Sequence, residues 1–265
     1  NSLDNFLESK RMTFPRFYFV SDDDLLEILG MSRMPFLVNK HIKKLFEGLK
    51  AMEVLEPGRH MNRMYECVAM RDTSSGEVAQ FPQSVALQGP VEEWLCDVEA
   101  SMFMAVEKLL ATSMQSCKGK DKAKWVSESC GQLLITTASI QWTNDCTRAL
   151  GTIAAGQKNA LRQSKKRQIS HVTKLTEMIR GSITSLCRKK LVALITIELH
   201  NRDVIERLLK GNCSSIQDFE WLSQLRFFFH KDEGLHGGFC SVRQINVRLD
   251  YGYEYQGNND LLSHH

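Results

Sequence analysis

The sequence predicts a mainly α fold: a multi-helix bundle with an inserted β-hairpin and a small antiparallel β element near the C-terminus. Three observations predict this class. Apolar side chains recur every three or four residues from Pro90 to Lys210, which is the period of an amphipathic helix. The period changes to that of strands between Tyr65 and Phe81. Apolar and polar side chains alternate strictly from Val247 to Tyr255, as in a half-buried strand.

The first elements are expected to be short. Asn1 to Arg11 carries apolar side chains at helical spacing and is expected to be the end of a helix, so the chain is expected to be cut from something longer. Phe14-Pro15 should stop this helix, because proline has no N–H to donate to the helical ladder. Arg16 to Val20 is an aromatic and β-branched run that we expect to be extended or buried.

A capped helix is expected next. Ser21 is a favourable N-cap, and Asp22, Asp23 and Asp24 follow in the first turn, where the helix dipole favours negative charge. Gly30 is a suitable C′ residue. Three adjacent aspartates could also hold a metal, but capping is a sufficient explanation for them.

The next segment is predicted to change from helix to hairpin. Val38 to Lys50 follows the helical period, and Ala51 to Met64 is expected to be a polar loop. A β-hairpin should follow, with strands Tyr65 to Met70 and Glu77 to Phe81 and a turn at Asp72 to Gly76.

Four long helices are predicted to form the bundle. Pro90 opens the first in the position that proline favours. The others are expected over the ranges Ser127 to Gly156, Gln163 to Leu186 and Arg188 to Lys210. Apolar residues at near-heptad spacing in the third of these helices are too few for a coiled coil, so packing inside a bundle is expected.

The final part is predicted to return to strands. Ser215 with Asp218 resembles a capping box that starts a short helix containing Trp221. The expected strands are Arg226 to His230 and Val242 to Tyr255, joined through the glycine-rich stretch Gly234 to Gly238.

Composition gives no reason to expect nucleic acid or a membrane as a partner. The chain has 265 residues, 43% of them hydrophobic and 25% charged, and a net charge of +3, which is ordinary for one or two globular domains. The basic clusters Lys118 to Lys124 and Arg162 to Arg167 are expected to be a loop and a solvated helix face. No apolar run approaches the ~20 residues of a membrane span.

Cysteine usage indicates reduced thiols rather than a disulfide framework or a zinc site. No pair has C-x-x-C spacing, and no signal peptide precedes them. The eight cysteines are Cys67, Cys96, Cys117, Cys130, Cys146, Cys187, Cys213 and Cys240.

Sequence motifs of common enzymes are absent. The chain has no Gly-x-x-x-x-Gly-Lys-Ser/Thr loop, no Gly-x-Ser-x-Gly elbow and no His-Glu-x-x-His. The most reactive-looking group is Glu198, His200, Arg202 and Asp203, where Glu198 and Arg202 are expected to pair along a helix while His200 points elsewhere. No catalytic, cofactor-binding or metal-binding residue is therefore assigned.

Several stretches, in order and over nearly the whole chain, resemble the linker of dynein heavy chains, with an axonemal rather than a cytoplasmic pattern. They are Leu7–Arg11 (LESKR), Phe14–Phe19 (FPRFYF), Asp24–Leu29 (DLLEIL), Gly89–Leu95 (GPVEEWL), Ile140–Thr143 (IQWT), Thr196–Val204 (TIELHNRDV), Trp221–Arg226 (WLSQLR) and Tyr251–Asn258 (YGYEYQGN).

This resemblance implies a role in a microtubule motor. Residues 1–240 would be the C-terminal part of the linker, a helical lever across a ring of AAA+ modules, and residues 241–265 would be the junction strand leading into the first module. The fragment would not be catalytic, because the nucleotide-binding loop is missing, and ATP and magnesium would belong to the parent motor. Its partners would be the ring of the same chain and, through the parent, microtubules and the intermediate and light chains. Its location would be the cytoplasm, cytoskeleton and ciliary axoneme.

A lever must be stiff, and close-packed helices with aromatic anchors such as Trp94, Trp142 and Trp221 would supply that stiffness. The loop Ala51 to Met64 is the candidate hinge. Two alternatives stay open: a stand-alone helical interaction or scaffold protein derived from such a linker, and an enzyme with a site around Glu198, His200 and Asp203.

Overall fold

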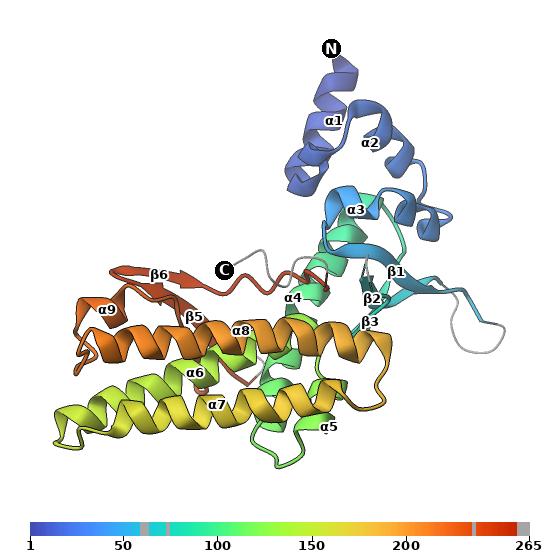
Figure 1. The fold of residues 1–265 in the computed structure, drawn as a ribbon. Helices are drawn as coiled ribbons and strands as arrows, with labels where there is room; N and C mark the ends of the chain where they lie inside the picture. Colours follow the sequence, from blue (N-terminus) through green and yellow to red (C-terminus); the bar gives the residue numbers. More distant parts are fainter. Residues whose placement is uncertain (59–63, 73–74, 235–236, 259–265) are drawn as a thin grey trace. The chain divides into compact units, whose positions relative to one another are not determined.

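The computed structural model describes residues 1–58, 64–72, 75–234 and 237–258. They form two compact units, each described by itself below (Figure 1). The first comprises Asn1–Val106 together with Tyr253–Asp260, and the second is built from Glu107–Gly252. Helices predominate and two small antiparallel sheets accompany them, so the predicted mainly α class with small β elements is confirmed.

Short helices around an aromatic core open the first unit. They are α1 (Ser2–Thr13), the 3₁₀ helix η1 (Pro15–Phe19), α2 (Asp22–Leu29), the 3₁₀ helix η2 (Pro35–Lys40) and α3 (Ile42–Leu45). Phe14 ends α1, as expected from the following proline. The ring centroids of Phe14 and Phe17 are 5.0 Å apart, and both side chains are fully buried. The expectation that this run is extended or buried is right for Phe17 and Val20, which are buried, but the backbone of Pro15–Phe19 is helical rather than extended.

The sheet of the first unit has three strands, in the order β1-β2-β3: β1 (Leu49–Leu55), β2 (Glu66–Asp72) and β3 (Val78–Ala86). The predicted hairpin is confirmed as β2 and β3. The predicted helix Val38 to Lys50 is wrong, because the chain makes only short turns there and enters β1 at Leu49. Ala51 to Leu55 belongs to β1 and is therefore not loop, while residues 59–63 of the expected loop lie outside the described residues.

Helices make up most of the second unit. Helix α4 (Val91–Ser116) crosses the boundary in sequence, and α5 (Lys122–Glu128), α6 (Gly131–Ala154), α7 (Ala160–Ile179) and α8 (Ser185–Lys210) follow. The predicted helix from Ser127 is wrong at its start, because Ser129 ends α5 in an extended conformation. The predicted helix to Leu186 is also too long, since α7 stops before Gly181. In the described part of the chain, no helix has the length and apolar content to cross a membrane.

Two hydrophobic clusters hold these helices together. One gathers Trp125, Leu175 and Leu194 from α5, α7 and α8. The other includes Trp142 and Trp221, whose ring centroids are 5.6 Å apart. This contact joins α6 to the short helix α9 (Phe219–Leu222), so two of the expected aromatic anchors meet directly.

The second sheet closes this unit, in the order β4-β5-β6: β4 (Arg226–His230), β5 (Phe239–Gln244) and β6 (Val247–Asp250). The strand Arg226 to His230 is confirmed. The single strand predicted from Val242 to Tyr255 is wrong, because Ile245 adopts a positive φ of 53° and turns the chain back on itself. Residues 251–258 form no strand, although the Tyr251 N–H still donates to the Cys240 carbonyl at 3.0 Å.

Candidate functional site

The segment Tyr253–Asn258, hereafter the C-terminal segment, lies against the first unit, to which it belongs. It has no regular secondary structure, yet Tyr255 and Asn258 are each 1% exposed and Tyr253 is 8% exposed. An irregular backbone stretch is normally solvated. Burial of this one therefore requires polar partners for it within the unit.

Asp72 at the end of β2, and Ser75 and Glu77 shortly before β3, supply most of those partners. The Tyr255 hydroxyl donates to Glu77 Oε1 at 2.7 Å. The Asn258 backbone N–H donates to Asp72 Oδ2 at 3.1 Å, and its side-chain amide donates to Ser75 Oγ at 2.9 Å and Glu77 Oε2 at 3.1 Å. Asp72 and Glu77 are themselves buried. Hydrogen bonds to buried carboxylates are among the stronger ones in proteins, so they fix the end of the segment firmly.

Arg16 ties the same segment to three helical elements. Its guanidinium forms ion pairs with Glu254 of the segment and with Glu99 of α4. It also donates to the backbone carbonyl of Leu45 at 3.1 Å and lies over the Phe46 ring at 4.5 Å. The guanidinium fork suits such multiple contacts better than a lysine ammonium would.

Two glycines allow the close approach. A Cβ on Gly48 would lie 2.4 Å from the backbone oxygen of Tyr255. Gly257 has a φ of +65°, and a Cβ there would lie 2.3 Å from Asp72 Oδ1. Only glycine fits at both positions. The only local sequence signal for this anchorage is the pair of tyrosines, Tyr253 and Tyr255, followed by Gly257-Asn258.

The group around Glu198 does not form one site. Glu198 is 3% exposed and contacts His171 Nε2 at 2.8 Å and the Asn201 amide at 2.8 Å. The predicted Glu198–Arg202 pair is wrong, since Arg202 instead pairs with Asp203 at 2.7 Å. His171 lies on α7, which sequence spacing along α8 could not reveal.

His200 is exposed and points away from Glu198, as expected. Glu198 borders a hollow of about 280 Å³ together with His171, Lys122 and Arg167. His200 borders a different and smaller hollow of about 50 Å³. Convergence of reactive groups is what an active site needs, and Glu198, His200 and Asp203 lack it.

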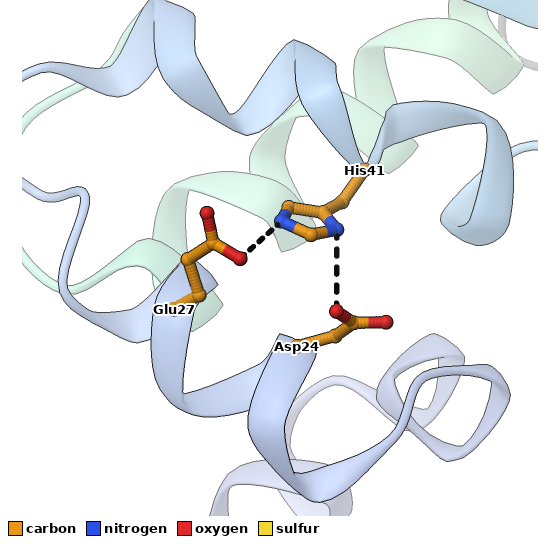
Figure 2. A group of neighbouring side chains, drawn as sticks. All are labelled: Asp24, Glu27 and His41. Carbon is orange, nitrogen blue, oxygen red and sulfur yellow. Dashed lines mark hydrogen bonds and ion pairs between the residues drawn. The ribbon is translucent and has the colours of Figure 1, made fainter.

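The aspartates of α2 act first as helix-start residues. Ser21 Oγ accepts from the Asp24 N–H at 3.2 Å, which confirms the predicted cap. Figure 2 shows that His41 lies between two carboxylates, with Nε2 3.2 Å from Glu27 and Nδ1 4.0 Å from Asp24.

Lysines contact the same two carboxylates. Lys40 reaches Glu27 at 2.9 Å and Lys44 reaches Asp24 at 2.7 Å. These hydrogen bonds lower the pKa of both carboxyl groups. Carboxylate and imidazole atoms here lie within 4.8 Å of one another, a set that a metal could use. Since each carboxylate already has a lysine and each ring nitrogen faces a different one, the direct interpretation is an ionic pin between α2 and the η2–α3 segment.

The thiols are poor candidates for nucleophiles. All eight cysteines are free. Burial raises the pKa of Cys67 and of Cys240 to about 12 and that of Cys213 to about 11. Because the thiolate is the reactive form, these side chains are inert at neutral pH.

Comparison with known proteins gives one consistent result. Residues 1–113 match the family described as Dynein heavy chain, N-terminal region 2. The chain is 46% identical over 262 residues to the Dynein-1-beta heavy chain, flagellar inner arm I1 complex, of Chlamydomonas reinhardtii. It is 44% identical over 264 residues to human Dynein axonemal heavy chain 2, and 33% identical over 260 residues to human Dynein axonemal heavy chain 12.

Each of these alignments covers 98% of the chain but only 6% to 8% of the relative. The chain thus spans a small part of the length of the proteins it matches. Along nearly its whole length the chain is similar to one segment of axonemal dynein heavy chains, and its residues 1–113 resemble the N-terminal region 2 of that family.

Proposed function

We propose that this chain is part of a dynein microtubule motor, namely the ring-attached half of the mechanical linker that converts ATP-driven changes of the AAA+ ring into movement. The observation that carries the proposal is the homology along 98% of the chain to axonemal dynein heavy chains. The chain itself is not catalytic in this proposal, since its family match is to the N-terminal region and it contains no P-loop.

The C-terminal segment supports a force-bearing role. In a linker of this kind, the chain would continue beyond this segment into the first AAA+ module. Tension from the module would therefore act first on Tyr253–Asn258. Buried hydrogen bonds to Glu77 and Asp72 and the ion pair to Arg16 resist displacement of that segment. A stiff attachment would pass ring motion to the unit instead of absorbing it.

The surroundings of the chain follow from the same proposal. Its direct partner would be the AAA+ ring of the same heavy chain. ATP and magnesium would bind the ring and not this segment. Microtubules and the intermediate and light chains would be reached through the parent motor, and the location would be the ciliary axoneme and cytoskeleton.

The test uses a full-length heavy chain that contains this sequence, with the double substitution Arg16→Gln and Tyr255→Phe. Both side chains hold the C-terminal segment. Loss of the attachment should lower microtubule gliding velocity severalfold while ATP turnover falls far less, because chemistry and movement become uncoupled. The measurements are gliding velocity and ATPase rate of the same preparation.

The matched control is Tyr18→Phe with Arg162→Gln, which removes the same two chemical groups from exposed positions. It should move at the velocity of the unmodified motor. If the Arg16→Gln, Tyr255→Phe motor keeps the same ratio of gliding velocity to ATPase rate as the unmodified motor, the lever role for this region is ruled out. Such a result would favour the scaffold alternative.

A further inference from the structure

Three arginines form a row across the second sheet. Arg226 of β4 pairs directly with Arg243 of β5, and Arg243 pairs with Arg248 of β6. Residues directly opposite each other point to the same face of a sheet. The three guanidinium groups therefore share one face, hereafter the arginine row. Like charges placed directly opposite one another are destabilising, so this arrangement has a cost.

No carboxylate in the described part of the chain neutralises Arg226 or Arg243. No carboxylate oxygen lies within 4.0 Å of a guanidinium nitrogen of Arg226 or Arg243, whereas Arg248 has a long contact of 3.8 Å with Asp250. The Nε atoms of Arg226 and Arg243 are buried without a hydrogen-bond partner. Burial and the nearby Arg243 charge lower the pKa of Arg226.

Phe228 holds the row in place from the same face. The guanidinium carbons of Arg243 and Arg226 lie 5.2 Å and 6.0 Å from its ring centroid. Stacking on an aromatic ring orients an arginine while leaving its N–H edge available to an anion. Arg226 is 7% exposed and would act through its charge, while Arg243 is half-buried and the Arg248 side chain is 47% exposed.

The strand that carries Arg248 is an open edge. β6 pairs with β5, and no other described strand pairs with it. All four of its residues are exposed, and in Figure 1 it forms the outer strand of the β5–β6 hairpin. On the face opposite Arg248, Val247 and Leu249 are 58% and 63% exposed. Exposed edges of this kind accept a further strand.

We propose that β6 is a docking edge for an extended segment of a partner protein in which acidic and apolar residues alternate. The added strand lies next to β6, with its carboxylates beside Arg248 and directed toward Arg243 one strand further in, and its apolar side chains beside Val247 and Leu249. Main-chain hydrogen bonds supply the pairing, and the arginine row selects negative charge. A free phosphate would satisfy the arginines but would leave the apolar pair and the strand edge uncovered. This inference is independent of the lever role.

The test is binding of a fluorescein-labelled peptide, Glu-Val-Glu-Val-Glu, to the 265-residue chain, followed by fluorescence anisotropy at low salt. We expect saturable binding that Arg243→Gln with Arg248→Gln weakens at least about tenfold, as truncation of a charged interface pair does. Circular dichroism checks that the variant keeps its helices. Arg226 is left unchanged because it is buried.

The charge-matched control is Arg162→Gln with Lys166→Gln, in the exposed basic cluster of α7. It should bind as the unmodified chain does. Equal weakening by both double variants would mean general charge attraction and would overturn the proposal. So would the absence of saturable binding, tight binding of Lys-Val-Lys-Val-Lys, or displacement of the peptide by an equal concentration of inorganic phosphate.

Discussion

Gly48 allows the C-terminal segment to pack closely because it has no side chain. It sits directly before β1, and the backbone of Tyr255 and Gln256 occupies the space where a Cβ would lie. The contact is with backbone and not with the flexible end of a side chain. Displacement of the C-terminal segment would break the hydrogen bonds of Tyr255 and Asn258.

Gly48→Ala should therefore destabilise the chain by about 1–3 kcal/mol, the range for overpacked buried sites. It should also release the C-terminal segment. The matched control is Gly151→Ala in α6, which meets no atom within 4 Å. That change should stabilise by about 0.5–1 kcal/mol, because alanine is the better helix former. Urea unfolding and amide hydrogen exchange of residues 253–258 measure both effects. Unchanged protection of these amides in Gly48→Ala would contradict this account of the packing.

Short elements in the first unit depend on charges as well as on apolar packing. Helix α2 has only eight residues, too few to be stable by propensity alone. The Ser21 cap and the ionic pin to Lys40, His41 and Lys44 add stability that the short apolar face of α2 cannot supply.

The pin makes a pH prediction with a definite sign. Hydrogen bonds from Lys44 and Lys40 lower the pKa values of Asp24 and Glu27 below their ordinary 3.8 and 4.5. A lowered folded-state pKa contributes stability above the unfolded value and loses it as pH falls through the folded value. Asp24→Asn with Glu27→Gln should therefore be less stable than the unmodified chain at pH 7, and the difference should shrink below about pH 4.5.

Urea unfolding at a series of pH values measures this difference. Glu47→Gln is the control, because Glu47 is exposed and makes no ion pair among the described residues. Its effect should be small and constant with pH. A difference for the double variant that persists unchanged at pH 3 would show that the pin does not act through charge.

Which elements the sequence could predict depended on how local their causes are. The cap at Ser21, the hairpin β2–β3 and the long helix α8 follow from neighbouring residues, and all three were predicted. The region from Val38 to Leu55 was not, because Val38 to Lys50 has the period of a helix and the segment from Ala51 resembles a polar loop. Strand pairing with β2 and the space at Gly48 decide its structure from far along the chain.

The contacts of Tyr253, Tyr255 and Glu198 likewise depend on residues far along the chain. Val242 to Tyr255 is predicted as one strand, but the turn at Ile245 separates β5 from β6, and Tyr253 and Tyr255 are buried in the anchored segment. The partner of Glu198 proved to be His171 on another helix. The spacing of residues within one helix or strand does not predict which residues of another element they contact.

The whole chain is not expected to bind ATP. The chain has no phosphate-binding loop, so the purified protein should show no saturable binding of a fluorescent ATP analogue up to about 1 mM, the upper end of common substrate affinities. Circular dichroism confirms folding in the same sample. Tight, saturable binding would reveal a site in this chain and would reopen the enzyme alternative around Glu198.

The C-terminal segment also governs the order in which the chain can fold. Residues 1–106 need Tyr253–Asn258 to complete their unit, yet the whole of 107–252 is made in between. During synthesis the second unit can form while the first still lacks the contacts that the C-terminal segment makes with Glu77, Asp72 and Arg16. Since domains fold as they emerge, the unit that is begun first on the ribosome is finished last. Asp72 and Glu77 then stay without their hydrogen bonds from the C-terminal segment until translation passes Asn258.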